Sequence, residues 1–306
     1  MYKRIITFLV ESLVVVFIIK LSKKIILPGF QKMPLHDVAI FFFRGMQKGA
    51  LPMRASAVSF SFFLAMFPSI IFVFTLIPYI PIENFQEKLL SLLEAFMPNN
   101  AYEATKDTIM DIVTNQRGGL LSIGFISALY FSTNGFNALI TAFNTTYHEI
   151  ETRTPLQQRM VSILLVIIST LLMTIAIGLI IFSEIALNRI FEKGQLSYYL
   201  ILGGRFVILF GLFYSLISFT YFLGTSRKSR WKFASAGSMF ATILTILTSV
   251  GFAYYVNNFG QYNKLYGSIG TLIVVLLWIY FNALVLLVGF ELNASIHQAK
   301  HKKIPL

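Results

Sequence analysis

Six long runs of apolar residues set the strongest limit on how this chain folds. A helix rises about 1.5 Å per residue, so about 20 apolar residues cross the roughly 30 Å of hydrocarbon in a bilayer. Membrane β-strands are about half as long and alternate in hydrophobicity, unlike these runs. The predicted spans are about residues 55–77, 120–143, 160–182, 201–223, 233–255 and 268–290.

Composition supports a membrane setting. The 306 residues are 56% apolar and 12% charged, whereas soluble domains have about 45–50% apolar and about 25% charged residues. A soluble globule of this size could not hide the surplus, but lipid accepts apolar side chains on the protein's outer surface. We therefore predict an all-α integral membrane protein, with one six-helix bundle over residues 37–296.

The basic residues predict an orientation. Most of the 25 Lys and Arg lie before the first span, in the second-to-third and fourth-to-fifth connections, and in the tail over residues 297–306. Short loops rich in Lys and Arg stay in the cytoplasm. Both termini are therefore expected there.

Two further segments allow alternative interpretations. Residues 5–27, within an N-terminal region over 1–36, are apolar with lysines at both ends, which favours a helix lying in the membrane interface over a seventh span. Residues 82–119 have helical periodicity. They predict an outer amphipathic hairpin that either covers the ends of the spans or forms a lid.

The fifth span carries a stripe of hydroxyl residues. Ser235, Ser238, Thr242, Thr245 and Ser249 are spaced by three or four residues, which places them on one helical face. Small polar residues often mediate close helix packing in membranes. The same stripe could instead line a polar cavity.

The second span carries a matching set of polar residues, Asn134, Asn137, Thr141 and Asn144. An amide cannot satisfy itself on its own helix as easily as a hydroxyl can. We expect these side chains to face the bundle interior, as a polar lining or as a clamp between helices.

Two other residues inside spans invite a functional interpretation. Arg205 lies in the fourth span, where its side chain could snorkel to the interface or contact an anion or lipid headgroup. Pro68 is expected to kink the first span, since it removes a backbone donor.

Glu291 lies at the predicted end of the last span. A carboxylate there needs a partner, and Arg54 and Arg44 are the candidates on the same side. We expect an ion pair or a gate formed by Arg54, Glu291 and Asn293.

Several classes of function are not supported by the sequence. There are no cysteines and only four dispersed histidines, so no metal site or catalytic cluster is predicted. Without a Walker motif, no nucleotide or other cofactor is expected. The net charge of +12 reflects membrane topology, and nucleic acid is not an expected partner.

Three groups of motifs carry a family resemblance. They are Arg54–Phe60 with Phe67-Pro68, Ala142–Asn144 with Tyr147, and Tyr266–Ser268 with Leu277–Tyr280 and Gly289–Asn293. Over residues 38–296 the chain resembles the YihY/BrkB family, with Phe290 where that family often has alanine. The resemblance implies a six-span bacterial inner-membrane protein. The family's former label, ribonuclease BN, does not fit this chain, because its acids lie mostly in the outer loop and its histidines are scattered.

Two main hypotheses for function follow. The first is a transporter or flippase for a lipid or another amphipathic envelope molecule, not driven by ATP, with membrane lipids as partners. The alternative is a membrane scaffold or assembly factor without transport activity. A membrane-embedded enzyme has the least support, because no acid, base and nucleophile are grouped in the sequence.

Overall fold

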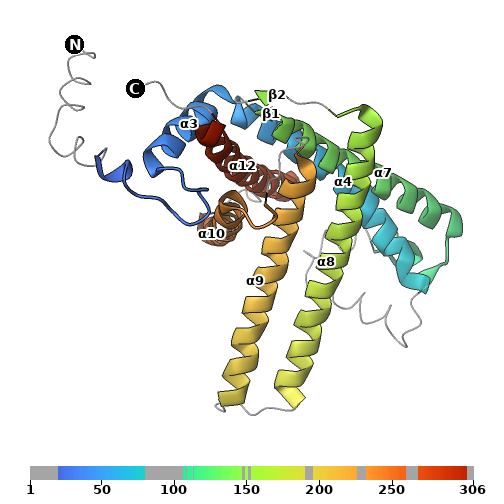
Figure 1. The fold of residues 1–306 in the computed structure, drawn as a ribbon. Coiled ribbons are helices and arrows are strands. Elements are labelled where there is room, and N and C mark those ends of the chain that lie inside the picture. Colours follow the sequence, from blue (N-terminus) through green and yellow to red (C-terminus); the bar gives the residue numbers. More distant parts are fainter. Residues whose placement is uncertain are drawn as a thin grey trace. The chain divides into compact units, whose positions relative to one another are not determined.

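Long helices make up nearly all of the described chain (Figure 1). The computed structural model describes residues 20–79, 106–107, 109–112, 114–146, 149–150, 153–189, 196–225, 232–259 and 268–301. The helices and strands are α3 (Leu35–Lys48), α4 (Leu51–Leu76), η1 (Ile77–Tyr79), α7 (Gly118–Asn144), β1 (Thr145–Thr146), β2 (Glu149–Ile150), α8 (Pro155–Arg189), α9 (Leu196–Gly224), α10 (Ala236–Phe259) and α12 (Ser268–His301). The two short strands pair antiparallel.

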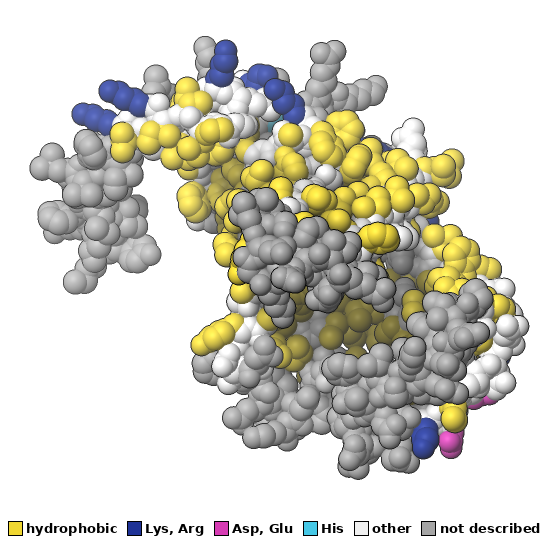
Figure 2. All heavy atoms as spheres, turned by 90° about the horizontal axis from the view of Figure 1, so that it is seen from below, with side chains coloured by type: hydrophobic (Ala, Val, Ile, Leu, Met, Phe, Trp, Pro, Cys, Tyr) yellow, Lys and Arg dark blue, Asp and Glu magenta, His cyan; other side chains and the backbone are white. Residues whose placement is uncertain are grey.

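Six of the described helices are long and apolar enough to cross a membrane, which confirms the predicted fold class. These candidate spans are Leu51–Tyr79, Gly118–Asn144, Pro155–Ser183, Ile201–Gly224, Ala236–Val256 and Ile269–Lys300. Their surfaces are apolar: Phe182 is 78% exposed and Leu171 is 59% exposed. Hydrophobic side chains also predominate among the described residues on the face in Figure 2. Hydrocarbon is the solvent that suits such surfaces.

The helix ends differ from those predicted. The first helix begins at Leu51, and the last continues to His301 instead of ending near residue 290. Glu291 and Asn293 therefore lie inside a helix and not at its end. Ser235 precedes α10 instead of belonging to it. Residues 5–19, most of the 82–119 hairpin and the last five residues of the tail lie outside the described ranges.

The chain divides into two compact units, and the larger comprises residues 1–59 and 136–306. In this unit α12 packs against α10 and α3, α8 packs against α9, and α9 also contacts α10. The long α8 and α9 lie side by side (Figure 1). This unit holds most of the predicted site residues.

Local sequence signals explain how α3 leads into α4. Pro34 is extended and precedes the helix, Asp37 lies in the first turn, and Lys48 lies in the last, as the helix dipole favours. The helix ends at Gly49, and Ala50 adopts a positive φ of 46°. That short turn brings Arg54 close to the end of α3.

The smaller unit comprises residues 60–135 and contains parts of α4 and α7. Gly124 allows a close approach, because an added Cβ would lie 3.2 Å from Cα of Phe72. The rings of Phe72 and Phe125 lie 5.4 Å apart. Pro68 lies inside α4 without ending the helix.

Candidate functional site

A buried carboxylate lies where α12 passes α3. The Glu291 side chain is fully buried. A Cβ atom on Gly45 would lie 1.9 Å from its Oε1 atom, so a side chain at residue 45 would force α3 or the Glu291 side chain to shift. The sequence suggested a neighbour in α3 only through Arg44, the residue that precedes Gly45.

Arg54 joins three parts of the larger unit. Its guanidinium donates to the carbonyl of Gly49 at 2.9 Å and to the carbonyl of Ala142 in the last turn of α7. It is also close enough to Glu291 for the two charges to attract each other. Carbonyls in the last turn of a helix lack intrahelical donors, so the guanidinium caps α7 while it faces the acid.

Asn293 holds the start of α10. Its Oδ1 accepts a hydrogen bond from the backbone N–H of Gly237 at 2.8 Å, and its Nδ2 donates to Ser235 Oγ at 2.8 Å. Ser235 is the N-cap, since its hydroxyl accepts from the N–H of Ser238 at 3.1 Å. We define the polar junction as Arg54, Glu291 and Asn293.

Small residues let α10 and α12 approach closely beside the polar junction. A Cβ on Gly237 would lie 2.2 Å from the Gly289 carbonyl, and one on Gly289 would lie 2.6 Å from the Ala241 Cβ. Gly237 and Ala241 are four residues apart in α10, and this spacing of small residues is one that membrane helices use for close packing.

The hydroxyl stripe of α10 faces the protein. Ser238, Thr242 and Thr245 are buried. The hydroxyls of Ser238 and Thr242 donate to carbonyls one turn earlier, at 2.9 and 2.7 Å. Ser249 Oγ lies 3.4 Å from Asn282 Oδ1 on α12. These contacts are those of helix packing and capping.

Three aromatic rings pack next to the polar junction. Phe143 and Phe290 stack with ring centroids 4.2 Å apart and planes 4° from parallel. Tyr221 meets both rings edge-on and donates its hydroxyl to the Leu286 carbonyl at 2.6 Å. Sequence reasoning missed Tyr221, although Phe290 stood out as a departure from the family pattern.

The predicted polar set on α7 is only partly brought together. Gln158 on α8 donates from Nε2 to Asn137 Oδ1 at 2.7 Å and to Thr141 Oγ1 at 2.8 Å. Asn144 instead reaches the Gly224 carbonyl at 3.5 Å. Asn134 belongs to the smaller unit. Gln158 was not predicted, and its place one turn inside an apolar helix was the available signal.

Arg153 is a second arginine that caps a helix and was not predicted. Its guanidinium donates to the carbonyl of Leu223 at 2.8 Å and to that of Thr225, at the end of α9. Burial lowers the pKa of Arg153 from its ordinary value. An arginine remains protonated at neutral pH in any case.

Arg205 lies near the opposite end of the α8–α9 pair. Its guanidinium reaches Ser183 Oγ on α8 at 3.5 Å and lies 5.7 Å from the centroid of the Phe206 ring. This places a cation inside a candidate span beside an exposed apolar side chain, since Phe206 is 59% exposed.

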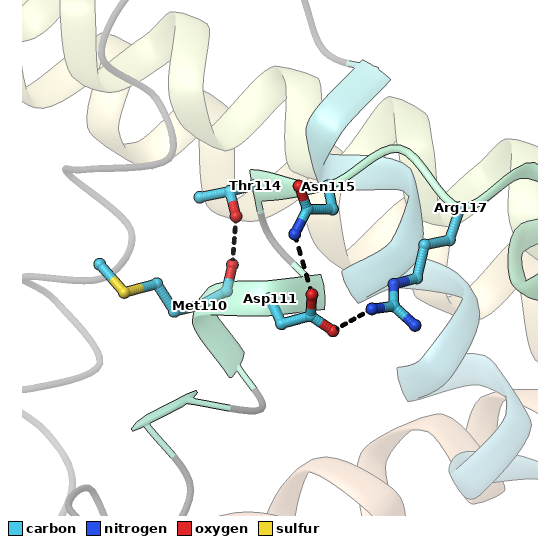
Figure 3. A network of polar contacts seen from close by, with 5 residues as sticks. All are labelled: Met110, Asp111, Thr114, Asn115 and Arg117. Atoms are coloured by element: carbon cyan, nitrogen blue, oxygen red, sulfur yellow. Dashed lines mark hydrogen bonds and ion pairs between the residues drawn. The ribbon is translucent and has the colours of Figure 1, made fainter.

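The smaller unit carries a separate surface network, drawn in Figure 3. Asp111 accepts hydrogen bonds from Asn115 Nδ2 at 2.8 Å and from Arg117 at 2.5 Å. The hydrogen bond from Asn115, and then that from Arg117, lower the pKa of the Asp111 carboxyl. Among the described residues no three His, Cys, Asp or Glu side chains are grouped so that they could hold a metal ion.

Six candidate spans, with buried polar contacts between their helices, define a multi-pass α-helical membrane protein. The chain belongs to the family described as Virulence factor BrkB, whose profile matches residues 42–305. This confirms the resemblance found in the sequence.

Two relatives are similar to this chain over most of its length. A UPF0761 membrane protein of Haemophilus influenzae is 24% identical over 86% of this chain and 96% of its own length. The Bacillus subtilis protein YfkH, named as ribonuclease-like, is 32% identical over 82% of this chain and 91% of its own length. No solved structure matches.

Proposed function

We propose that this chain is a bacterial inner-membrane protein that moves a lipid, or another amphipathic envelope molecule, across the bilayer. Both termini lie in the cytoplasm, and the process does not use ATP hydrolysed by this chain, since the sequence has no Walker motif. The observation that carries the proposal is a line of polar side chains along α8.

This polar line of α8 consists of Gln158, Ser162, Ser169 and Ser183. Gln158 and Ser183 are separated by nearly seven helical turns, so they share one face of α8 and lie about 38 Å apart. Each end has a polar partner, because Gln158 binds Asn137 and Ser183 lies near Arg205. A headgroup would therefore find polar contacts near both membrane surfaces.

Between these ends Ser162 and Ser169 lie on the same face of the first half of α8, whereas the face between Ser169 and Ser183 carries apolar residues. The hydroxyls of Ser162 and Ser183 donate to the carbonyls of Gln158 and Ile180 on their own helix. Ser162 is fully buried. The Ser169 hydroxyl is buried and makes no hydrogen bond in the part of the chain that the structure describes. The opposite face of α8 exposes Ile167 and Leu171. A polar headgroup moving along the line could leave its tails in the surrounding hydrocarbon, which lowers the cost of taking it through the bilayer.

A scaffold without transport activity is the second candidate. It is favoured by α10, where the hydroxyls of Ser238 and Thr242 hydrogen-bond the backbone of their own chain segment, and by Asn293, which acts as a cap. Polar residues used in this way hold helices together and require no substrate.

Reconstitution separates the two candidates. Purified full-length protein is placed in liposomes containing a fluorescent phospholipid, and dithionite bleaches only the outer leaflet. We expect bleaching beyond the outer-leaflet fraction, faster than in protein-free vesicles, with or without a proton or sodium gradient. If no condition accelerates lipid exchange and the protein co-purifies stably with an envelope complex, the scaffold is the correct function.

A further inference from the structure

The segment over residues 20–48 forms a compact platform on the end of α12. Phe30 and Val38 are buried against Ile296 and Ala299. Backbone hydrogen bonds close the segment on itself, including one from the N–H of Leu35 to the carbonyl of Ile25 at 2.9 Å. We call residues 20–48 the N-terminal platform.

The outer surface of the N-terminal platform combines two kinds of side chain. Large apolar side chains are exposed: Ile26 is 54% and Phe43 is 60% exposed. All its basic residues are also exposed, namely Lys20, Lys23, Lys24, Lys32, Arg44 and Lys48. Figure 2 shows Lys and Arg beside hydrophobic side chains at the edge where this segment lies.

Acidic residues do not balance this charge. Asp37 is the one carboxylate within the platform, and it lies 3.0 Å from His36 Nδ1. Basic side chains next to exposed apolar ones match the headgroup region of an anionic bilayer, where the apolar groups enter the acyl boundary and the cations meet phosphates.

From this arrangement we infer that the N-terminal platform is a binding surface for anionic phospholipid headgroups. The inference does not rest on lipid transport, since a scaffold could use the same surface. Residues Phe43 and Ile26 supply the apolar contact, while Lys23 and Lys24 on the adjoining turn supply charge. Because α12 carries the platform, lipid bound there is linked to the helix that holds Glu291.

Soluble short-chain lipids test the inference on the full-length protein in neutral detergent. Dioctanoyl phosphatidylglycerol, dioctanoyl phosphatidylcholine and inorganic phosphate are titrated separately, and the half-saturating concentration is measured from the thermal unfolding shift. We expect phosphatidylglycerol to act at the lowest concentration and free phosphate to have no effect. The K23Q/K24Q variant should raise the phosphatidylglycerol value by about fivefold for each lysine.

The matched control is K23R/K24R, which keeps the charge and should behave as the native chain does. Equal action of the two lipids, or no change in K23Q/K24Q, would overturn the inference. A label on F43C gives a second measurement in vesicles containing phosphatidylglycerol. A quencher attached to lipid should quench the label at residue 43. A label that this quencher does not reach would overturn the inference as well.

Discussion

The Glu291 carboxylate occupies the space that a Cβ atom on Gly45 would need, with Oε1 only 1.9 Å from that position. The contact joins α12 to α3 and brings the acid within electrostatic reach of Arg54. Any larger residue at position 45 must displace either the helix or the carboxylate.

We therefore expect G45A to lower the free energy of unfolding by about 1–3 kcal/mol, the range for overpacking a close contact. Unfolding in mixed micelles measures the change. The matched control is G178A, because a Cβ on Gly178 meets no atom within 4 Å. Equal stability of the two variants would show that α3 does not press on Glu291.

The cap on α10 leads to a second prediction. Replacing Asn293 with alanine removes the acceptor for Gly237 N–H and the donor to Ser235, so N293A should lose about 1–2 kcal/mol. Asn258 is exposed and bonds only to its own helix within the described chain, at the Tyr254 carbonyl. N258A should change stability by less than about 0.5 kcal/mol. A similar loss in both variants contradicts the capping role.

Low pH should loosen the surface network of the smaller unit. Because the pKa of Asp111 is lowered in the fold, its contribution is present above its unfolded value of about 4 and is lost as pH falls through the folded value. A spin label on T114C should therefore gain mobility on acidification below about pH 4. In D111N the label should already be mobile at neutral pH. Superimposable pH curves for the two proteins would refute this account.

The orientation can be tested because the chain has no cysteine to remove. Single cysteines at Lys232 and Lys300, both exposed, should be labelled from the cytoplasmic side. A cysteine at Thr114, also exposed, should be labelled from the opposite side. If the cysteines at positions 232 and 300 were labelled from different sides of the membrane, the six-span topology would be excluded.

The sequence predicted the spans well because hydropathy over 20 residues is a local property. The predicted last span stops near residue 290, since Glu291 and Asn293 have the polarity expected of a boundary, whereas α12 continues to His301. Only the fold shows that Gly45 and Gly237 make room for them. Polar character alone therefore could not separate a helix end from a buried contact.

The sequence also could not show which residues far apart in the chain contact one another. Arg153 caps a helix end 70 residues away in sequence. Gln158 binds Asn137 21 residues earlier. Nothing in the spacing of α8 indicated which neighbour its polar residues face. The hydroxyl residues Ser238, Thr242 and Thr245 of the predicted stripe are buried, and Ser235 is the cap that starts the helix.

Lipid exchange in variants of α8 tests the central claim most directly. Q158L and S169A alter the polar line, while T174V removes a hydroxyl from the exposed face, where Thr174 bonds to the Thr170 carbonyl. With all three proteins folded, Q158L and S169A should slow dithionite-detected lipid exchange by about tenfold, roughly the effect of losing one hydrogen bond to a polar headgroup, and T174V should match the native rate. Equal rates in all three variants, or no exchange by the native protein, would contradict the account.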